Sequence, residues 1–172
     1  KNRADKKTVD LCSGSGAIAV ALDKISGAEV TAVEIDETAF SYLETNVKEN
    51  NSSVKPVMAD ALKICDTFAD GELDLIVSNP PYIKSADIET LQKEVRLEPR
   101  LALDGGEDGY DFYREIVSRW SRKLKKGGAL AFELGEGQAD AVKALMTDKD
   151  FSDFKISLDF GGVQRAIIGT LL

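Results

Sequence analysis

The order of secondary-structure signals along the chain constrains its fold more than any other feature. Short apolar runs typical of buried strands alternate with stretches whose apolar residues recur at helical spacing. We expect strands at residues 8–12, 30–33, 54–58, 73–77, 129–134, 154–158 and 166–171. We expect helices at residues 17–24, 38–50 and 139–146, and a further helix with the apolar stripe Phe112, Ile116, Trp120 and Leu124, ended by Gly127 and Gly128. The longest stretch without periodicity is residues 84–110, and a loop of that length is more often functional than idle.

This alternation predicts an α/β fold with a mostly parallel seven-stranded sheet. Strand–helix–strand units place helices on both faces of such a sheet, and the last two strands are expected to close it with an antiparallel C-terminal strand. In sheets of this kind ligands bind beyond the carboxyl ends of the strands. We therefore expect the functional residues directly after the strands, at residues 12–16, Glu34, Asp60 and Asn79.

The composition is that of one globular domain, and we assign residues 1–172 to it. The sequence has no histidine, and its two cysteines, Cys12 and Cys65, form no Cys-x-x-Cys pair, so we expect no metal site. This sparse use of cysteine fits the reducing cytoplasm. No apolar run approaches the ~20 residues of a membrane span, so no membrane association is expected.

The formal net charge of −8 bears on the partner. Proteins that grip a phosphate backbone place positive charge at the contact, because released counterions drive that binding. An acidic chain therefore disfavours a nucleic-acid partner, although a locally basic face would remain compatible with one.

Residues 10–16, Asp-Leu-Cys-Ser-Gly-Ser-Gly, leave the first expected strand and enter the first expected helix. Gly14 and Gly16 allow a sharp turn and a close approach of a ligand, since neither has a Cβ. The helix that follows begins with free N–H groups. The same residues fit a tight turn without a ligand, and they also fit the Gly-x-Gly-x-x-Ala pattern of dinucleotide-binding proteins. The turn thus indicates a nucleoside-containing cofactor without identifying it.

Carboxylates near the strand ends favour S-adenosylmethionine over NAD as that cofactor. Asp10 would repel a pyrophosphate but can accept hydrogen bonds from the ammonium group of a methionine moiety. Glu34 stands where a carboxylate can bind both ribose hydroxyls, although NAD enzymes share this feature and Asp36 competes for the role. Asp60 and Ala61 are expected to meet the adenine amino group, and Asp60 alone fits a helix cap equally well.

Asn79-Pro80-Pro81-Tyr82 follows the fourth expected strand and is the most specific signal in the chain. Two consecutive prolines lack N–H groups and have a fixed φ, so this segment is stiff and presents carbonyl acceptors. The Asn79 side-chain oxygen and the Pro80 carbonyl can accept both hydrogens of a planar –NH2 group. Tyr82 offers an aromatic face for a flat amide or base. An ordinary loop is the alternative, but the position at a strand end, on the same edge as the glycine turn, favours a nitrogen-binding site.

The chemistry of an amide or exocyclic amino nitrogen explains the need for such a site. This nitrogen is a poor nucleophile because its lone pair is delocalised. Two fixed acceptors orient it so that the lone pair points at the sulfonium methyl carbon, and positioning and electrostatics can carry much of the barrier to in-line transfer. We therefore expect Asn79, Pro80 and Tyr82 to act in catalysis, and Pro81 to join them in binding the substrate.

With both motifs in place, the chain resembles the Rossmann-like class I methyltransferases. More closely, it resembles the PrmC/HemK family of protein-(glutamine-N5) methyltransferases, which act on peptide chain release factors. The resemblance covers essentially the whole chain. The Asn-Pro-Pro-Tyr element is shared with adenine-N6 and some guanine-N2 nucleic-acid methyltransferases, so residues 95–103, 105–114 and 161–165 carry the more specific likeness.

The resemblance implies a set of site residues. Its S-adenosylmethionine contacts fall on Cys12, Ser13, Gly14, Ser15, Gly16, Glu34, Asp60 and Ala61, to which Asp10 and Asn79 are added, and its glutamine contacts fall on Asn79, Pro80, Pro81 and Tyr82. Many relatives have glycine where this chain has Cys12 and aspartate where it has Glu34. The family also carries an N-terminal helical domain that helps hold the release factor. Because this chain opens at Lys1 and enters an expected strand at Thr8, we expect a fragment that lacks that domain.

The leading expectation is therefore methyl transfer from S-adenosylmethionine to the side-chain amide of a glutamine in a release factor, with S-adenosylhomocysteine as the product. The alternative is an adenine-N6 or guanine-N2 methyltransferase of DNA or RNA, which predicts a basic face beside Tyr82. A cofactor-binding module without catalysis and an NAD oxidoreductase are the remaining alternatives.

Overall fold

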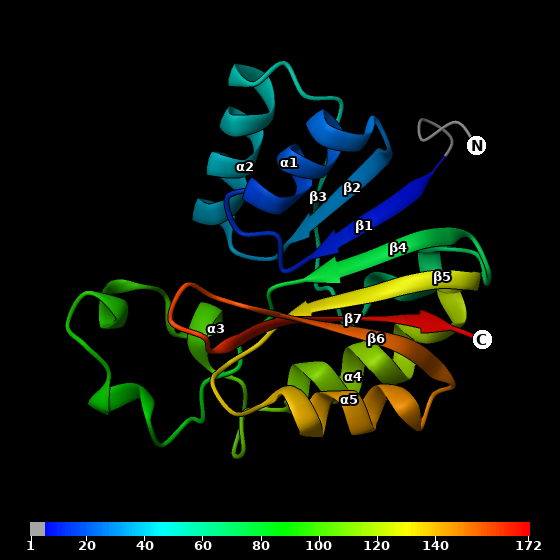
Figure 1. The fold of residues 1–172 in the computed structure, drawn as a ribbon. Coiled ribbons are helices and arrows are strands. Elements are labelled where there is room, and N and C mark those ends of the chain that lie inside the picture. Colours follow the sequence, from blue (N-terminus) through cyan, green and yellow to red (C-terminus); the bar gives the residue numbers. More distant parts are fainter. Residues whose placement is uncertain (1–5) are drawn as a thin grey trace.

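A computed structural model describes residues 6–172, and residues 1–5 of the predicted domain lie outside the described residues. A seven-stranded sheet runs through the molecule in the order β3-β2-β1-β4-β5-β7-β6 (Figure 1). The first five strands in this order pair in parallel, while β7 lies antiparallel between β5 and β6. The predicted fold class, a mostly parallel sheet with an antiparallel C-terminal strand, is confirmed.

The N-terminal half of the sheet is built from strand–helix–strand units. Its elements are β1 (Lys7–Leu11), α1 (Ala17–Ser26), β2 (Glu29–Glu34), α2 (Glu37–Glu49), β3 (Lys55–Met58), the 3-10 turn η2 (Ile64–Thr67) and β4 (Leu73–Ser78). Figure 1 shows α1 and α2 together on one face of the sheet. All of β1 except its first residue is buried, as expected of a central parallel strand covered on both faces.

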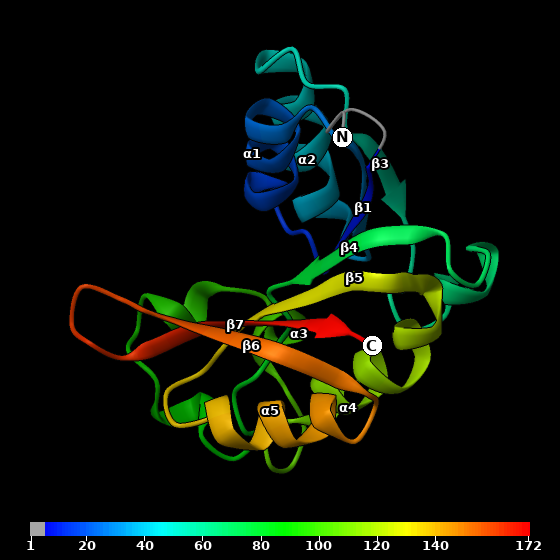
Figure 2. The ribbon, with the colours of Figure 1, turned by 45° about the vertical axis from the view of Figure 1, so that its right-hand side comes forward.

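The C-terminal half carries helices on the opposite face (Figures 1 and 2). Its elements are α4 (Asp111–Trp120), the 3-10 turn η5 (Ser121–Lys123), β5 (Leu124–Glu133), α5 (Ala139–Thr147), β6 (Phe151–Leu158) and β7 (Gln164–Leu171). Trp120 is fully buried, and its indole N–H donates a hydrogen bond of 2.9 Å to the carbonyl of Ala61. This bond ties the end of α4 to the segment that follows β3.

One expectation about α4 is wrong. The helix ends at Trp120, and Leu124 does not continue its apolar stripe but pairs with Leu73 as the first residue of β5. Gly127 and Gly128 therefore lie within the strand, where the register with β4 shifts, and the φ of 76° at Gly127 gives the left-handed backbone that such a bulge accommodates. Leu124 would be buried both as the last residue of a longer α4 and as the first residue of β5. Hydrophobic spacing alone therefore could not distinguish the helix from the strand.

Residues 84–110 leave the sheet at its carboxyl edge and return to it. They contain two 3-10 turns, η3 (Ile88–Thr90) and η4 (Val95–Leu97), and the short helix α3 (Arg100–Leu103). The Ile83 N–H donates to the Leu103 carbonyl at 2.9 Å, and the Gly105 N–H donates to the Ile83 carbonyl at 2.7 Å. We call residues 84–104, whose two ends these bonds join, the 84–104 excursion; Figure 1 shows it projecting beyond the ends of β4 and β5.

Candidate active site

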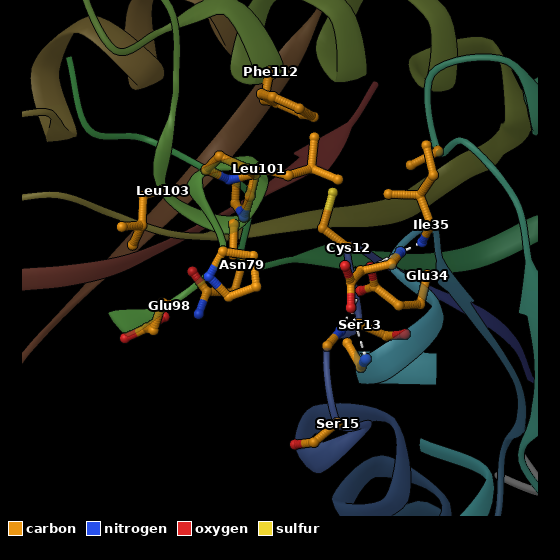
Figure 3. A pocket seen from close by; sticks show the side chains of 18 of the residues that line it. Cys12, Ser13, Ser15, Glu34, Ile35, Asn79, Glu98, Leu101, Leu103 and Phe112 are labelled. Carbon is orange, nitrogen blue, oxygen red and sulfur yellow. Dashed lines mark hydrogen bonds between the residues drawn. The ribbon is translucent and has the colours of Figure 1, made fainter. Parts of the chain in front are cut away.

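A cavity of about 980 Å³ opens at the carboxyl edge of the sheet (Figure 3). Its walls come from the ends of β1 to β5 and from the 84–104 excursion. The cavity therefore lies where a parallel sheet is expected to bind its ligand. Of the predicted site residues, the lining contains Cys12, Ser13, Gly14, Ser15, Glu34, Asp60, Ala61, Asn79, Pro80, Pro81 and Tyr82, whereas Asp10 and Gly16 are not part of it.

The two glycines of the turn after β1 have different tasks. Gly14 has a φ of 55°, and a Cβ placed on it would meet no atom within 4 Å, so its missing side chain leaves open space at the cavity wall. Gly16 has a φ of 81°, but a Cβ there would lie 2.3 Å from the Cδ1 atom of Leu43 in α2. Asn46 also holds α2 against the turn, because its side-chain amide donates to the Ser15 carbonyl at 2.9 Å. The absence of a side chain at Gly16 thus allows α2 to pack against the turn.

Cys12 adopts a φ of 55°, which glycine tolerates and other residues rarely adopt. Figure 3 shows its side chain in the cavity between the side of Glu34 and the side of Asn79. Burial, reinforced by the negative charge of Glu34, raises the pKa of the thiol to about 12. The thiol is therefore neutral at physiological pH and acts as an apolar lining group rather than a nucleophile.

Glu34 ends β2, and its carboxylate organises the backbone beside the cavity. One oxygen accepts a hydrogen bond from the Gly14 N–H at 2.7 Å, and the other accepts from the N–H groups of Ile35 and Asp36, both at 2.8 Å. A carboxylate has roughly four acceptor sites, so these three bonds leave about one site of Glu34 free for a ligand. Asp36, the competing ribose ligand, is the N-cap of α2 and accepts from the Ala39 N–H at 2.8 Å. Both carboxylates line the cavity, and each already has a structural partner.

Asp60 and Ala61 follow β3 at the cavity wall. One oxygen of Asp60 accepts from the Leu62 N–H at 2.8 Å, and the other pairs with Lys63 at 2.9 Å. Partial burial opposes ionisation, but these partners together hold the pKa of Asp60 below its ordinary value. Asp60 therefore caps the turn after β3 and is ionised at neutral pH.

Asp10 and Ser13 supply buried polar atoms without protein partners. Within residues 6–172, neither carboxylate oxygen of Asp10 nor the hydroxyl of Ser13 has a hydrogen-bond partner. Burial raises the pKa of Asp10 to about 7, and the negative charge of Glu34 adds to this rise. Leaving a buried polar group unpaired costs ~1–3 kcal/mol, so these atoms fit a site that a polar ligand completes.

The Asn79–Tyr82 segment is fixed relative to the glycine turn by the strand that precedes it. The Ser78 hydroxyl at the end of β4 donates a hydrogen bond of 2.8 Å to the Leu11 carbonyl at the end of β1. Pro80 is buried, whereas Asn79 is exposed. Figure 3 shows Asn79 across the cavity from Glu34, with Cys12 between them. The structure thus brings the predicted cofactor-binding residues near the glycine turn and the Asn79–Tyr82 segment to opposite walls of one cavity.

The sequence prediction missed Glu133, which ends β5 and lines the same cavity. Burial raises the pKa of the Tyr82 phenol, Glu133 raises it further by its charge and a hydrogen bond, and Arg165 opposes the shift. Tyr82 and Glu133 both line the cavity, whereas Arg165 does not. The signal for Glu133 was present in the sequence, because it stands at the end of the fifth strand, where the carboxyl-edge rule also applies.

An apolar wall was also missed. It consists of Val95, Leu101 and Leu103 from the 84–104 excursion and Phe112 from α4. We expected Phe112 to belong to the core-facing stripe of its helix. It packs against the core and also lines the cavity. No local sequence signal separates an apolar residue that lines a cavity from one that fills a core.

All charged side chains in the cavity lining are carboxylates, namely Glu34, Asp36, Asp60, Glu98 and Glu133, and no lysine or arginine of residues 6–172 lines it. Arg165, which influences Tyr82, is itself paired with Asp159 at 3.0 Å. The basic face that a nucleic-acid substrate would require is therefore not found in this lining.

Two further structural findings concern the described part of the chain. No group of histidine, cysteine, aspartate or glutamate side chains among residues 6–172 is arranged to hold a metal ion. In the same range, no helix has both the length and the apolar character needed to cross a bilayer.

Comparison with known proteins identifies the family. The family described as the methyltransferase small domain matches residues 1–98. The chain belongs to this family. The chain is 42% identical over 165 residues to the release factor glutamine methyltransferase of Geobacter sulfurreducens, covering 95% of this chain and 57% of that protein. It is 41% identical over 168 residues to the enzyme of the same name from Bradyrhizobium diazoefficiens, covering 94% and 54%. The resemblance expected from the sequence is confirmed, and the chain spans a little over half the length of these relatives.

Solved structures agree on the fold of this methyltransferase small domain. A methyltransferase from Pyrococcus furiosus matches with a TM-score of 0.74 at 23% identity, covering 99% of this chain and 77% of that one. TrmN from Thermus thermophilus matches with a TM-score of 0.69 at 19% identity, covering 97% and 44%. At such identities the likeness concerns the fold alone.

Proposed function

We propose that this chain is the catalytic part of an enzyme that methylates the side-chain amide nitrogen of a glutamine in a peptide chain release factor. The observation that carries the proposal is that the Asn79–Tyr82 segment and the glycine turn line one cavity. The names of the relatives support the choice of substrate. The proposal treats residues 1–172 as one domain and places the reaction in the cytoplasm, where release factors act.

S-adenosylmethionine fits the wall formed by the glycine turn and the ends of β2 and β3. The open space at Gly14 admits a ligand, Ser13 lines the same cavity, and the polar side-chain atoms of Ser13 and Asp10 have no partner among residues 6–172. Glu34, Asp60 and the other predicted contacts, apart from Asp10 and Gly16, line the same cavity. When bound, S-adenosylmethionine supplies an electrophilic methyl group and leaves as S-adenosylhomocysteine.

The residues after β4 hold the substrate nitrogen. The Asn79 side-chain oxygen and the Pro80 carbonyl accept the two amide hydrogens and orient the nitrogen toward the opposite wall. Tyr82 stays neutral, because burial raises the pKa of its phenol, and it offers a flat face to the amide. The apolar wall of the 84–104 excursion excludes water around this nitrogen.

The charge of the cavity supports a protein substrate over a nucleic acid. Among residues 6–172, five carboxylates and no lysine or arginine line it, so a phosphate backbone would be repelled rather than held. A glutamine side chain carries no charge and meets no such repulsion. The release factor is therefore the partner that we propose, with no role for nucleic acid.

Labelled-methyl transfer by the full-length protein tests this function. A release factor, unmodified DNA and ribosomal RNA are offered side by side, and we expect label on a glutamine of the release factor. Asn79→Ala is expected to slow transfer by about 100-fold, a size typical of losing one fixed polar contact to the reacting group. Its dissociation constant for S-adenosylmethionine, measured by calorimetry, should stay within about threefold, because the opposite wall holds the cofactor.

The matched control is Asn50→Ala, since Asn50 is an exposed asparagine at the end of α2, away from the cavity. This variant should retain full activity. Label found on nucleic acid alone would replace the proposed substrate, and an Asn79→Ala variant as active as Asn50→Ala would remove Asn79 from the mechanism.

A further inference from the structure

Gln138 is a buried polar residue that lies outside the cavity lining. It directly precedes α5 and is 8% exposed. Although it occupies the N-cap position of α5, its side chain makes no capping hydrogen bond. Helix capping therefore does not explain why a polar side chain is buried here, and the partners of its amide give the explanation.

The side-chain amide of Gln138 forms four hydrogen bonds, which connect Tyr82 with segments that pack near it. Its oxygen accepts from the Gly135 N–H at 2.9 Å and from the Tyr113 hydroxyl at 3.2 Å. Its nitrogen donates to the Tyr82 carbonyl at 3.1 Å and to the Gly109 carbonyl at 3.2 Å. Both donor hydrogens are thus used, and one side chain joins the residue after the two prolines to the chain that returns from the 84–104 excursion.

Three glycines bring the backbone of these segments unusually close to Tyr82. A Cβ on Gly105 would lie 2.7 Å from the Tyr82 Cα, and one on Gly109 would lie 2.6 Å from the Tyr82 carbonyl oxygen. A Cβ on Gly135 would lie 3.0 Å from the Tyr82 ring. Tyr82 is therefore enclosed from three sides by main chain, and the Gln138 amide supplies the donor that its enclosed carbonyl needs.

We infer that Gln138 is a positioning residue for methyl transfer, whose side-chain amide clamps the Tyr82 carbonyl to the Gly109 carbonyl and thereby sets the position of Asn79. The inference rests on the proposed function. Pro80 and Pro81 transmit the constraint, because each has a fixed φ and the segment between Asn79 and Tyr82 has few ways to bend. An error of about 1 Å in the placement of a reacting group can cost on the order of 100-fold in rate, so a clamp three residues away affects catalysis.

Gln138→Glu is the sharpest test, because glutamate has the same shape and keeps the acceptor oxygen. It replaces the donating nitrogen with an oxygen that faces the carbonyls of Tyr82 and Gly109 and repels both. A buried carboxyl has a raised pKa, and its protonated form can donate one of the two lost hydrogen bonds.

Asp23→Asn is the matched control. Asp23 is 9% exposed, belongs to α1, and accepts hydrogen bonds from the Ser52 hydroxyl, the Ser53 hydroxyl and the Ser53 N–H at 2.6, 2.6 and 3.1 Å. Like Gln138 it holds a connecting segment through a buried side chain, and it does not line the cavity. The substitution is also isosteric.

The kinetic readout is kcat on the glutamine substrate, with the dissociation constant for S-adenosylmethionine measured in parallel. Gln138→Glu is expected to lower kcat by about 100-fold and to leave the cofactor constant within about threefold. The ratio of its kcat to that of the parent should rise as the pH is lowered, because protonation restores one donor. Asp23→Asn should stay within about twofold of the parent at every pH.

Backbone hydrogen exchange provides a readout that needs no substrate. The N–H groups of Ile83 and Gly105, which pair across the base of the excursion, should exchange at least about tenfold faster in Gln138→Glu and at the parental rate in Asp23→Asn. If Gln138→Glu does not fold, Tyr113→Phe removes the hydroxyl that donates to the Gln138 side-chain oxygen at 3.2 Å and to the Glu133 carbonyl at 2.9 Å, and we then expect kcat to fall by about tenfold.

An unchanged kcat together with unchanged exchange in Gln138→Glu would overturn the positioning role, as would a fully active Tyr113→Phe where that variant is needed. The two proposals can also fail separately. If the parent enzyme labels no glutamine but Gln138→Glu still accelerates exchange at Ile83, the proposed function is wrong and the structural clamp is retained.

Discussion

Cys12 holds a backbone conformation at the cavity wall that suits glycine better than cysteine. Its φ of 55° costs a residue with a Cβ ~1–2 kcal/mol. The neutral thiol adds apolar lining to the cavity in return. The sequence predicted that Cys12 lies in the turn. The backbone strain at Cys12 was not predicted, because it depends on a φ value that the residue type does not reveal.

This strain can be measured with two substitutions at position 12. We expect Cys12→Gly to unfold with a free energy about 1 kcal/mol higher than Cys12→Ala, because only the alanine keeps a Cβ in the left-handed region. Urea denaturation of the two variants gives the difference.

The control pair uses an ordinary helical site. Ala144 is exposed in α5, and Ala144→Gly should lower the free energy of unfolding by about 1 kcal/mol, the usual order for the two residues. If alanine were also the more stable residue at position 12, the left-handed conformation would carry no strain.

Among elements, the end of β4 is the one on which the site depends. Ser78 fixes it to β1, and Gly105 packs against the backbone of Tyr82 just beyond it. The φ of Gly105 is not in the left-handed region, so the close approach rather than the backbone angle requires a glycine there.

Gly105→Ala tests this close approach. The new Cβ would lie 2.7 Å from the Tyr82 Cα and 2.9 Å from the Pro81 carbonyl oxygen, and backbone cannot move aside as a flexible side chain can. We expect a loss of about 1–3 kcal/mol in the free energy of unfolding, the typical cost of overpacking, and weaker methyl transfer. Thermal unfolding and the transfer assay measure the two effects.

Gly161→Ala is the comparison variant. Gly161 also lies outside the left-handed region, and a Cβ there would meet only an Asp159 side-chain oxygen at 3.2 Å. It should change stability by less than about 0.5 kcal/mol, as surface substitutions usually do. Equal effects at positions 105 and 161 would contradict the packing argument.

Sequence patterns predicted those elements and contacts that depend on local order along the chain. The strands, the glycine turn and the Asn79–Tyr82 segment follow from local periodicity and from proline and glycine chemistry. Gln138 did not follow, because three of its four partners, Tyr82, Gly109 and Tyr113, are distant in sequence and only the folded chain brings them together. The start of β5 at Leu124 was missed for a related reason, since its pairing with Leu73 is a long-range contact.

At the scale of the whole molecule, Asp10 and Asp74 make the free energy of unfolding depend on pH in opposite directions. Burial raises the pKa of Asp10 to about 7 in the folded chain, so the folded state retains a proton that the unfolded state has released. The associated stability is complete below about pH 4 and is lost as the pH rises to 7. Asp74 is the reverse case: burial opposes ionisation, but Lys125, Lys6 and the Lys7 N–H hold its pKa at about 2.

Asp10→Asn should therefore gain stability relative to the parent as the pH rises. The difference in free energy of unfolding is expected to change by on the order of 4 kcal/mol between pH 4 and 7 and to level off above 7, because about three pK units separate the folded and unfolded values. Urea denaturation of the ligand-free chain across this range measures the difference.

Asp74→Asn is the control for this titration. The stabilisation by Asp74 is complete above about pH 4 and disappears only as the pH falls toward 2, so its difference from the parent should be flat between pH 4 and 8. A constant difference for Asp10→Asn over the same range would show that Asp10 has an ordinary pKa.

The bridge between Ile83 and Asp104 makes the 84–104 excursion a detour that leaves and rejoins the molecule at one point. Doubling the length of a loop with closed ends costs only ~0.6 kcal/mol of closure entropy. Its length can therefore change while the bonds at its base keep Asn79 in place relative to the glycine turn, provided that Val95, Leu101 and Leu103 still line the cavity. The fold thus keeps the residues at the strand ends on a fixed frame and adds the 84–104 excursion as a separate wall of the same cavity, whose shape can be redesigned without rebuilding the sheet.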